Sequence, residues 1–260
     1  MSTLQLPKSS KILVVISAGF VLAAGVRILH HESASWFLVV LAFLASGFLA
    51  DAFTGLAHFG FDYVFPDKMP ILGPIAMEFR EHHDYPTLDP SNYAENLTKG
   101  CWCSLPLSIL VFYLAGEHPS GGAWFAVLAT LFGMSAWGFF FHQIHSYAHM
   151  GSILPPEELH ACIARIRLLP SPTEQVTEFA KLFEAVPIPT PIRILQQCRI
   201  LLNPATHNLH HVLFESDFSS VNGWSDPLLN LVLGPIARRK KAASAPADEQ
   251  GQLFLHGDVP

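Results

Sequence analysis

Residues 123–141 read AWFAVLATLFGMSAWGFFF, an uncharged run rich in phenylalanine that leads directly into HQIHSYAH at residues 142–149. A bilayer core about 30 Å thick is crossed by about 20 apolar residues in a helix. The run is therefore predicted to span a membrane, and the histidines that follow it should lie at the membrane surface. Both features, apolar runs and short histidine clusters, recur elsewhere in the chain.

Three further apolar stretches, residues 12–29, 36–57 and 102–115, are also predicted to be spans. The last of them is short, but tilting or the snorkelling of Lys99 can extend it. Hydrophobic residues make up 50% of the chain and charged residues only 14%, whereas soluble domains carry about 25% charged residues. We therefore expect an all-α integral membrane protein with four transmembrane helices.

The orientation of the spans is predicted from the basic residues in the loops, which favour the cytosolic side. All of the 15 lysines and arginines except Arg27 fall on one side of a four-span arrangement, so both termini should be cytosolic. In a eukaryotic cell we expect this membrane to be the endoplasmic reticulum. The membrane domain is expected at residues 12–241, between a cytosolic N-terminus at 1–11 and a disordered tail at 242–260. The net charge of −6 argues against a nucleic-acid partner.

Histidine is unusually abundant, with 14 residues in the chain. Nine of them form four clusters that the predicted topology places at the cytosolic face. Residues four apart share one face of a helix, so the spacing within each cluster favours convergence. We therefore predict a cytosolic, histidine-rich helical cap. The clusters are His58 followed by Asp62; His82 and His83; His142, His145 and His149; and His207, His210 and His211.

A group of converging imidazoles is best explained by metal. Imidazoles held together repel one another when protonated and need partners when neutral, and a metal ion satisfies them. No cysteine lies in the clusters, and the histidines number about twice the four ligands that a structural zinc takes. Two ions with open positions fit better. Imidazole suits both iron and zinc; we expect two iron ions that activate O₂, with zinc as the alternative.

The ordered set of segments resembles the lipid desaturase domain of plasmanylethanolamine desaturase, in the family also called the Kua or CarF-like group. That family includes the plant fatty acid desaturase 4 type enzymes. The resemblance covers roughly residues 35–235, and any one segment alone would be a weak signal. The segments are AHFGFD at 57–62, PILG at 70–73, FREHH at 79–83, QIHSYAH at 143–149, HNLHH at 207–211 and, more weakly, NGW at 222–224.

Membership would imply a set of eight histidine ligands. His142 stands where the family more usually has asparagine, so it is either an extra ligand or a hydrogen-bonding partner of one. Asp62 is likewise either a ligand or a carboxylate that orients a ligand. The implied ligands are His58, His82, His83, His145, His149, His207, His210 and His211.

The resemblance further implies an oxidoreductase that uses O₂ to convert an alkyl-ether phospholipid with an ethanolamine head group into the vinyl ether of a plasmalogen. We expect the lipid chain to enter a slot between the second and fourth spans. No Gly-x-Gly-x-x-Gly fingerprint for a nicotinamide or flavin occurs, so electrons should come from a partner such as cytochrome b5. The alternatives are a fatty-acyl desaturase of the same family, a zinc-dependent membrane hydrolase, and a non-catalytic adaptor.

The segment between His149 and His207 is longer than in the family and aligns poorly with it, which leaves the identity of the substrate open. Two stretches in it, residues 174–185 and 192–202, have apolar side chains at helical spacing. Each can be read as a surface helix that covers the site, or as an amphipathic helix lying in the membrane interface.

Overall fold

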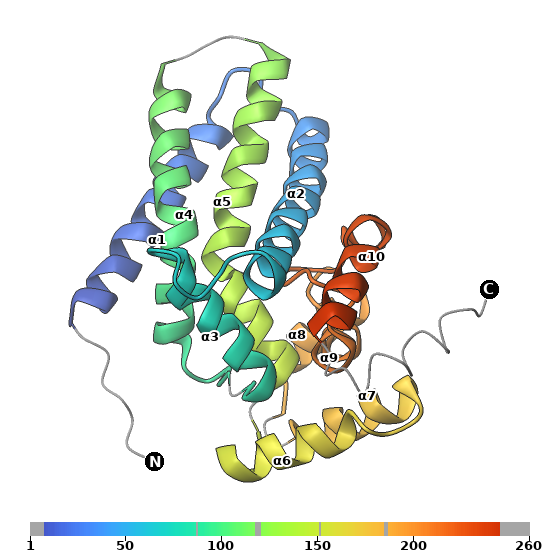
Figure 1. Ribbon diagram of the computed structural model, residues 1–260. Helices are drawn as coiled ribbons and strands as arrows, with labels where there is room; N and C mark the ends of the chain where they lie inside the picture. The colour runs from blue at the N-terminus through green and yellow to red at the C-terminus, as the bar shows by residue number, and fades with distance from the viewer. Residues whose placement is uncertain (1–7, 87, 118–120, 151, 185–186, 245–260) are drawn as a thin grey trace.

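The computed structural model describes residues 8–86, 88–117, 121–150, 152–184 and 187–244, which form ten helices and no strand. Four helices are long and apolar enough to cross a membrane, as expected. They are α1 (Lys8–Leu29), α2 (Trp36–Tyr63), α4 (Tyr93–Gly116) and α5 (Gly122–His149). They stand side by side as a bundle (Figure 1), and the shorter helices gather beyond one end of it. The predicted all-α membrane architecture with a histidine-rich cap is therefore confirmed.

The spanning helices are longer than the apolar runs that predicted them. Helix α2 continues past residue 57 and α5 past residue 141, and α4 begins at Tyr93 rather than at residue 102. Helical hydrogen bonds join backbone groups and do not require apolar side chains. The polar ends of α2 and α5 therefore continue as helix and carry histidines out of the bundle on rigid backbone.

Small residues let the bundle helices approach closely, as is common for helices packed in lipid. Gly100 of α4 lies against α5 so tightly that a Cβ atom there would come within 2.2 Å of the Phe139 carbonyl oxygen. Ser17 of α1 and Ser104 of α4 are joined by a 2.9 Å hydrogen bond between their hydroxyls. The Ser135 hydroxyl of α5 donates to the Ser104 carbonyl at 3.0 Å.

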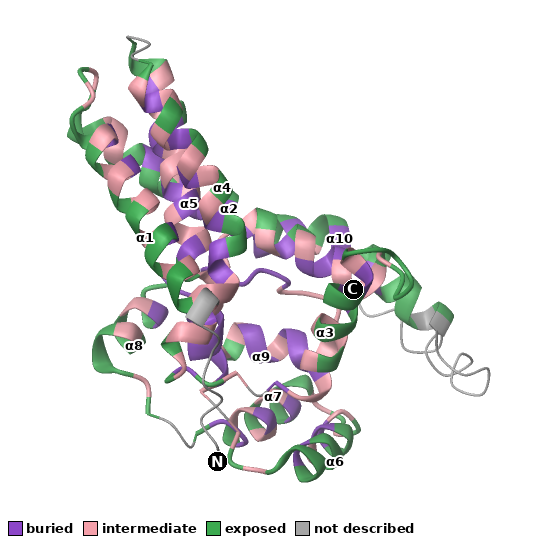
Figure 2. Ribbon diagram, turned by 90° about the vertical axis from the view of Figure 1, so that its left-hand side faces the viewer, coloured by how far each residue is buried: buried purple, intermediate pink, exposed green. Residues whose placement is uncertain are grey.

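The cap is a layer of short helices at the histidine-rich end of the bundle (Figures 1 and 2). Phe179 and Phe183, at and just after the end of α7, pack with Leu159 and Ile163 of α6 and with Val212 of α9. The stretch at 174–185, as far as residue 184, thus consists of most of α7 and the turn after it, which pack against α9 as a surface element; residue 185 lies outside the described part of the chain. The cap consists of α3 (Leu72–Asp84), α6 (Pro156–Ile166), α7 (Pro172–Lys181), α8 (Thr190–Gln197) and α9 (Pro204–Leu213).

Helix α10 (Asp226–Ser244) leaves the base of the bundle at a steep angle to it (Figure 2). Its buried side chains Leu229 and Leu233 pack with Phe59 of α2 and with Phe218. The helix runs into the tail predicted to begin at residue 242; residues 245–260 lie outside the described part of the chain. Similarly, α1 begins at Lys8, inside the predicted N-terminal segment at 1–11.

An even number of spans predicts that both termini lie on the same side, and the loop charges predict that this side is cytosolic. In sealed vesicles with the cytosolic face outward, added protease should remove epitope tags from both termini. Protection of one tag would contradict four spans, and protection of both would reverse the orientation. Glycosylation of Asn96 is a poor test, because this side chain is buried and donates to Gln143 and Ser146.

Candidate metal centre

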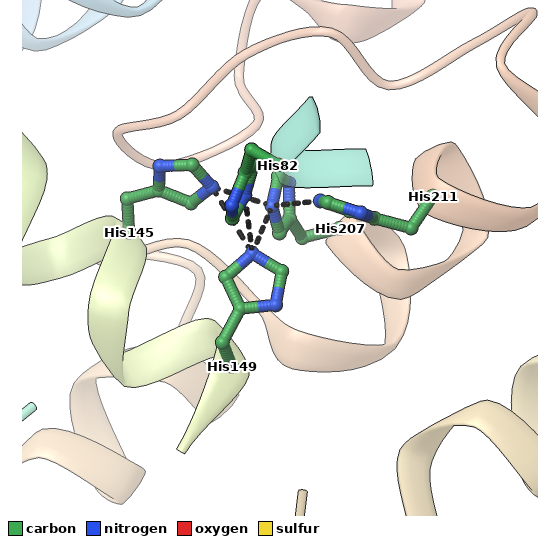
Figure 3. Close-up of side chains that lie close together, drawn as sticks. All are labelled: His82, His145, His149, His207 and His211. Atoms are coloured by element: carbon green, nitrogen blue, oxygen red, sulfur yellow. Dashed lines mark hydrogen bonds between the residues drawn. The ribbon is translucent and has the colours of Figure 1, made fainter. Parts of the chain in front are cut away.

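Five histidines from three helices converge in a first cluster (Figure 3). Their Nε2 atoms face one another, with separations of 2.7 Å between His145 and His207, 3.1 Å between His145 and His149, and 2.9 Å between His149 and His207. His82 lies 3.2 Å from His149, and His211 lies 3.1 Å from His207. The three closest nitrogens thus form a triangle.

Such a triangle is difficult to satisfy with protons alone. Each neutral imidazole has one N–H donor and one acceptor nitrogen, so each Nε2 atom is either a donor or an acceptor. Among three Nε2 atoms in mutual contact, at least one pair therefore consists of two donors or two acceptors, which cannot form a hydrogen bond. Two imidazoles bound to one ion at a metal–nitrogen distance of about 2.1 Å hold their nitrogens about 3.0–3.4 Å apart. The observed separations are close to this range, so the first cluster fits one metal ion.

A second cluster contains three histidines and a carboxylate. The Nε2 atoms of His58, His83 and His210 form another triangle with sides of 3.1, 3.2 and 3.3 Å. The carboxylate oxygens of Asp62 lie 3.5–3.7 Å from these nitrogens. Both oxygens are buried, and neither has a hydrogen-bond partner among the described residues. A buried carboxylate without a donor is costly, and a cation between it and the three imidazoles removes that cost.

Burial keeps the cap histidines in the neutral form that binds metal. It lowers the pKa of His82, His207 and His211 well below the ordinary value, and the neighbouring imidazoles lower it further. Burial also lowers the pKa of His83, although the nearby Asp62 carboxylate opposes this. Binding a metal to these residues therefore requires little displacement of protons.

Adjacent histidines serve different clusters. His82 and His83 of α3 belong to the first and second cluster, respectively, and His211 and His210 of α9 do the same. Consecutive residues on a helix point about 100° apart, so one His-His pair can reach two positions. Two such pairs on facing helices place the clusters side by side. This explains why the sequence contains His-His pairs rather than only histidines spaced by four.

Backbone carbonyls orient two ligands of the second cluster. The Nδ1 atom of His58 lies 2.9 Å from the carbonyl oxygen of Phe218, and Nδ1 of His210 lies 2.7 Å from that of Ser216. A hydrogen bond from Nδ1 leaves Nε2 as the free acceptor and fixes the ring. The loop between α9 and α10 thus aims these rings at the shared point.

Asp51, the single charge in the second apolar run, holds this loop. Its fully buried carboxylate accepts hydrogen bonds from the backbone N–H groups of Asn222 at 2.8 Å, Gly223 at 3.0 Å and Ser225 at 2.9 Å. It also accepts from the Ser225 hydroxyl at 2.7 Å. We refer to these contacts between Asp51 and residues 222–225 as the Asp51 clip. Burial, with a contribution from the nearby Asp51 charge, raises the pKa of Asp226 to about 6.

Every histidine predicted as a ligand lies in one of the two clusters, and Asp62 lies in the second. His142 lies in neither, and its ring centre is 6.1 Å from that of His145. Its Nε2 atom is buried and has no hydrogen-bond partner among the described residues. The Asp51 clip was not predicted as part of the site, although a charge inside an apolar span was a signal for it.

One cavity of about 420 Å³ reaches the first cluster, where His82 and His145 form part of its wall. It lies between α3, α4 and α5. A larger apolar cavity of about 630 Å³ borders α1, α2, α4 and α5, and so adjoins the second and fourth spans between which the lipid slot was expected, but no clustered histidine lines it. Phe179 and Phe183 lie over His211 and His149 from the cap side, each with a ring-centre distance of 5.8 Å. The cavity between α3, α4 and α5 therefore reaches two of the predicted ligands, His82 and His145.

Comparisons with known proteins agree on one family. The family model described as the lipid desaturase domain matches residues 47–176, half of the chain. Plasmanylethanolamine desaturase from Myxococcus xanthus is 30% identical over 143 residues, which cover 53% of this chain and 47% of that protein. Plasmanylethanolamine desaturase 1 from Mus musculus is 24% identical over 200 residues, 75% of this chain and 61% of that protein. The chain thus spans only about half to three-fifths of these curated relatives. No solved structure matches.

The two clusters predict that purified protein carries about two metal ions per chain, and that the ions depend on separate residues. His145→Ala should remove the ion of the first cluster and His210→Ala that of the second, as measured by elemental analysis. His160→Ala, outside both clusters, is the matched control. His142→Asn should keep both ions; if it loses metal as completely as His145→Ala, His142 is a ligand.

The Asp51 clip predicts that Asp51→Asn is destabilising, because an amide nitrogen cannot accept the hydrogen bonds that one carboxylate oxygen receives. Leaving buried donors unpaired should lower the free energy of unfolding by about 2–4 kcal/mol. Thermal unfolding in detergent measures this, with the exposed Glu178→Gln as control. Metal content should fall mainly at the second cluster. An unchanged melting temperature with full metal content would show that the clip does not support the site.

Proposed function

This chain belongs to the lipid desaturase domain family, and on that premise we propose that it forms the vinyl ether of a plasmalogen from an alkyl-ether phospholipid. The proposal is carried by the two clusters of largely buried histidines, one of them with a carboxylate that has no hydrogen-bond donor among the described residues. Their donor set of imidazoles and one carboxylate suits iron. The relatives named plasmanylethanolamine desaturase support the choice of an ether lipid.

The residues of the chain would hold two iron ions as already described: His82, His145, His149, His207 and His211 around one, and His58, Asp62, His83 and His210 around the other. Bound iron would supply the activation of O₂, which is chemistry that side chains do not provide. In the balanced reaction, two hydrogens leave adjacent carbons of the alkyl chain. O₂ is reduced to two waters with two electrons and two protons from outside.

The protein's own part is to position the lipid and to exclude water. The cavity between α3, α4 and α5 brings the lipid to His82 and His145. Phe179 and Phe183 lie over the first cluster from the cap side, and Phe214 lies against His83 of the second, with ring centres 4.8 Å apart. An apolar shell protects a reactive site from competing reactions with water. The backbone carbonyls of Ser216 and Phe218 keep two ligand rings in place.

Two electrons per turnover must come from a redox partner, for which we propose cytochrome b5 or a protein of the same class. The clusters lie at the end of the bundle that the loop charges predict to be cytosolic. A soluble donor, or one anchored on that face, would have access to the cap. In a eukaryotic cell we place the protein in the endoplasmic reticulum membrane.

Expression in cells that lack plasmalogens but contain alkyl-ether phospholipids tests the reaction. Lipid mass spectrometry should show a new acid-labile product two hydrogens lighter than the ether lipid, formed only with O₂. The metal-ligand variant His207→Ala should form none. New double bonds in ester-linked acyl chains would instead identify an acyl desaturase, and O₂-independent cleavage with zinc bound would identify a hydrolase.

A further inference from the structure

The cavity that reaches the first cluster also has an ion pair in its wall. Lys99 of α4 and Glu78 of α3 both line it, and Lys99 Nζ lies 2.8 Å from Glu78 Oε1. The two side chains are 37% and 66% exposed. The remaining wall is largely apolar and includes Phe79, Trp102 and Phe141. One cavity thus joins a pair of opposite charges to two predicted metal ligands.

We propose that this cavity is a head-group site, in which Lys99 binds a lipid phosphate and Glu78 binds a primary ammonium group. The inference rests on the proposed function and names the part of the lipid that the site recognises. A phosphate and an ammonium on one head group can replace the single Lys99–Glu78 pair with two ion pairs. The exchange leaves no charge unpaired, which matters beside an apolar wall.

Helix geometry places this head-group site close to the metal ligands. Glu78 precedes His82 by four residues on α3, which is about 6 Å along the helix axis. On α5, His142, which also lines the cavity, precedes His145 by three residues, or about 4.5 Å along the helix axis. A lipid held at Glu78 and Lys99 therefore presents the beginning of its chain to His82 and His145, not its middle. The vinyl ether of a plasmalogen lies at that beginning, next to the glycerol oxygen.

His142 fits as a third contact in this site. It lines the same cavity, and its buried Nε2 atom lacks a hydrogen-bond partner among the described residues. A buried ring nitrogen of this kind is normally paired. An oxygen of the phosphate or of the glycerol linkage would pair it in the bound complex. This gives His142 a role toward the lipid while leaving it outside both metal clusters.

The charge pattern predicts which head groups are accepted. A phosphoglycerol head group is anionic, so it would pair with Lys99 and leave the Glu78 carboxylate without its partner. A phosphocholine head group has the right charges, but its methylated nitrogen cannot donate hydrogen bonds to a carboxylate. A phosphoethanolamine head group satisfies both residues, so we expect it to bind most tightly.

Calorimetric titration of the metal-loaded full chain in detergent with short-chain phosphatidylethanolamine, phosphatidylcholine and phosphatidylglycerol tests the site. Glu78→Gln should weaken binding of phosphatidylethanolamine about tenfold and bring it close to that of phosphatidylglycerol. Lys99→Gln should weaken binding of all three lipids, because all carry phosphate. Glu81→Gln, on the exposed face of the same helix, and Lys68→Gln are matched controls and should bind like the unchanged protein.

Equal affinity of the unchanged protein for the three lipids, or unchanged selectivity in Glu78→Gln, would overturn the proposal. Elution volume and metal content of each variant identify any that fails to fold, and in that case the conservative Glu78→Asp and Lys99→Arg replace it. The measurement needs no turnover. Loss of head-group selectivity alongside vinyl-ether formation would reject this site alone, and selective binding without vinyl-ether formation would reject the proposed reaction alone.

Discussion

The structure depends on bringing eight imidazoles and one carboxylate into a space where their ligand atoms nearly touch. Within each cluster, the close nitrogen pairs lie 2.7–3.3 Å apart, and Asp62 has no hydrogen-bond donor among the described residues. Protons alone cannot satisfy such a set, whereas cations between the ligand atoms would. The predicted ligands come from α2, α3, α5 and α9. Metal binding would therefore hold the cap helices α3 and α9 against the two spanning helices, and its free energy would contribute directly to folding.

The features predictable from sequence are those that repeat locally. Apolar runs about as long as a bilayer is thick predicted the four spans. The short histidine clusters, together with the family resemblance, predicted the histidines that the structure brings together. The predicted spans end before α2 and α5 do, because the apolar run stops where the histidines begin while the backbone continues as helix. Hydrophobicity reports the lipid boundary, whereas the end of a helix depends on backbone geometry and capping.

The features that could not be predicted depend on contacts between distant segments. Asp51 is a single charge in an apolar run, and only the fold shows that it binds the backbone at residues 222–225. The pairing of Glu78 with Lys99 joins two helices separated by a turn region, and neither residue belongs to a recognisable motif. The segment at 174–185 was equally compatible with the membrane interface. Its place over α9 follows from packing of Phe179 and Phe183 with Val212, which no local pattern specifies.

The two clusters have different surroundings, and they differ in their position relative to the cavity. The first contributes His82 and His145 to the wall of the cavity. The second contributes none of its ligands to either cavity described here; instead, the loop that the Asp51 clip holds supplies carbonyls to His58 and His210. The pairs His82–His83 and His210–His211 each contribute one histidine to either cluster. They connect the two clusters mechanically, because each pair lies on one rigid turn of helix. A shift of α3 or α9 must therefore move both clusters together. The clip holds the loop beside the cluster away from the cavity, and through the two His-His pairs that cluster is tied to the one that lines the cavity.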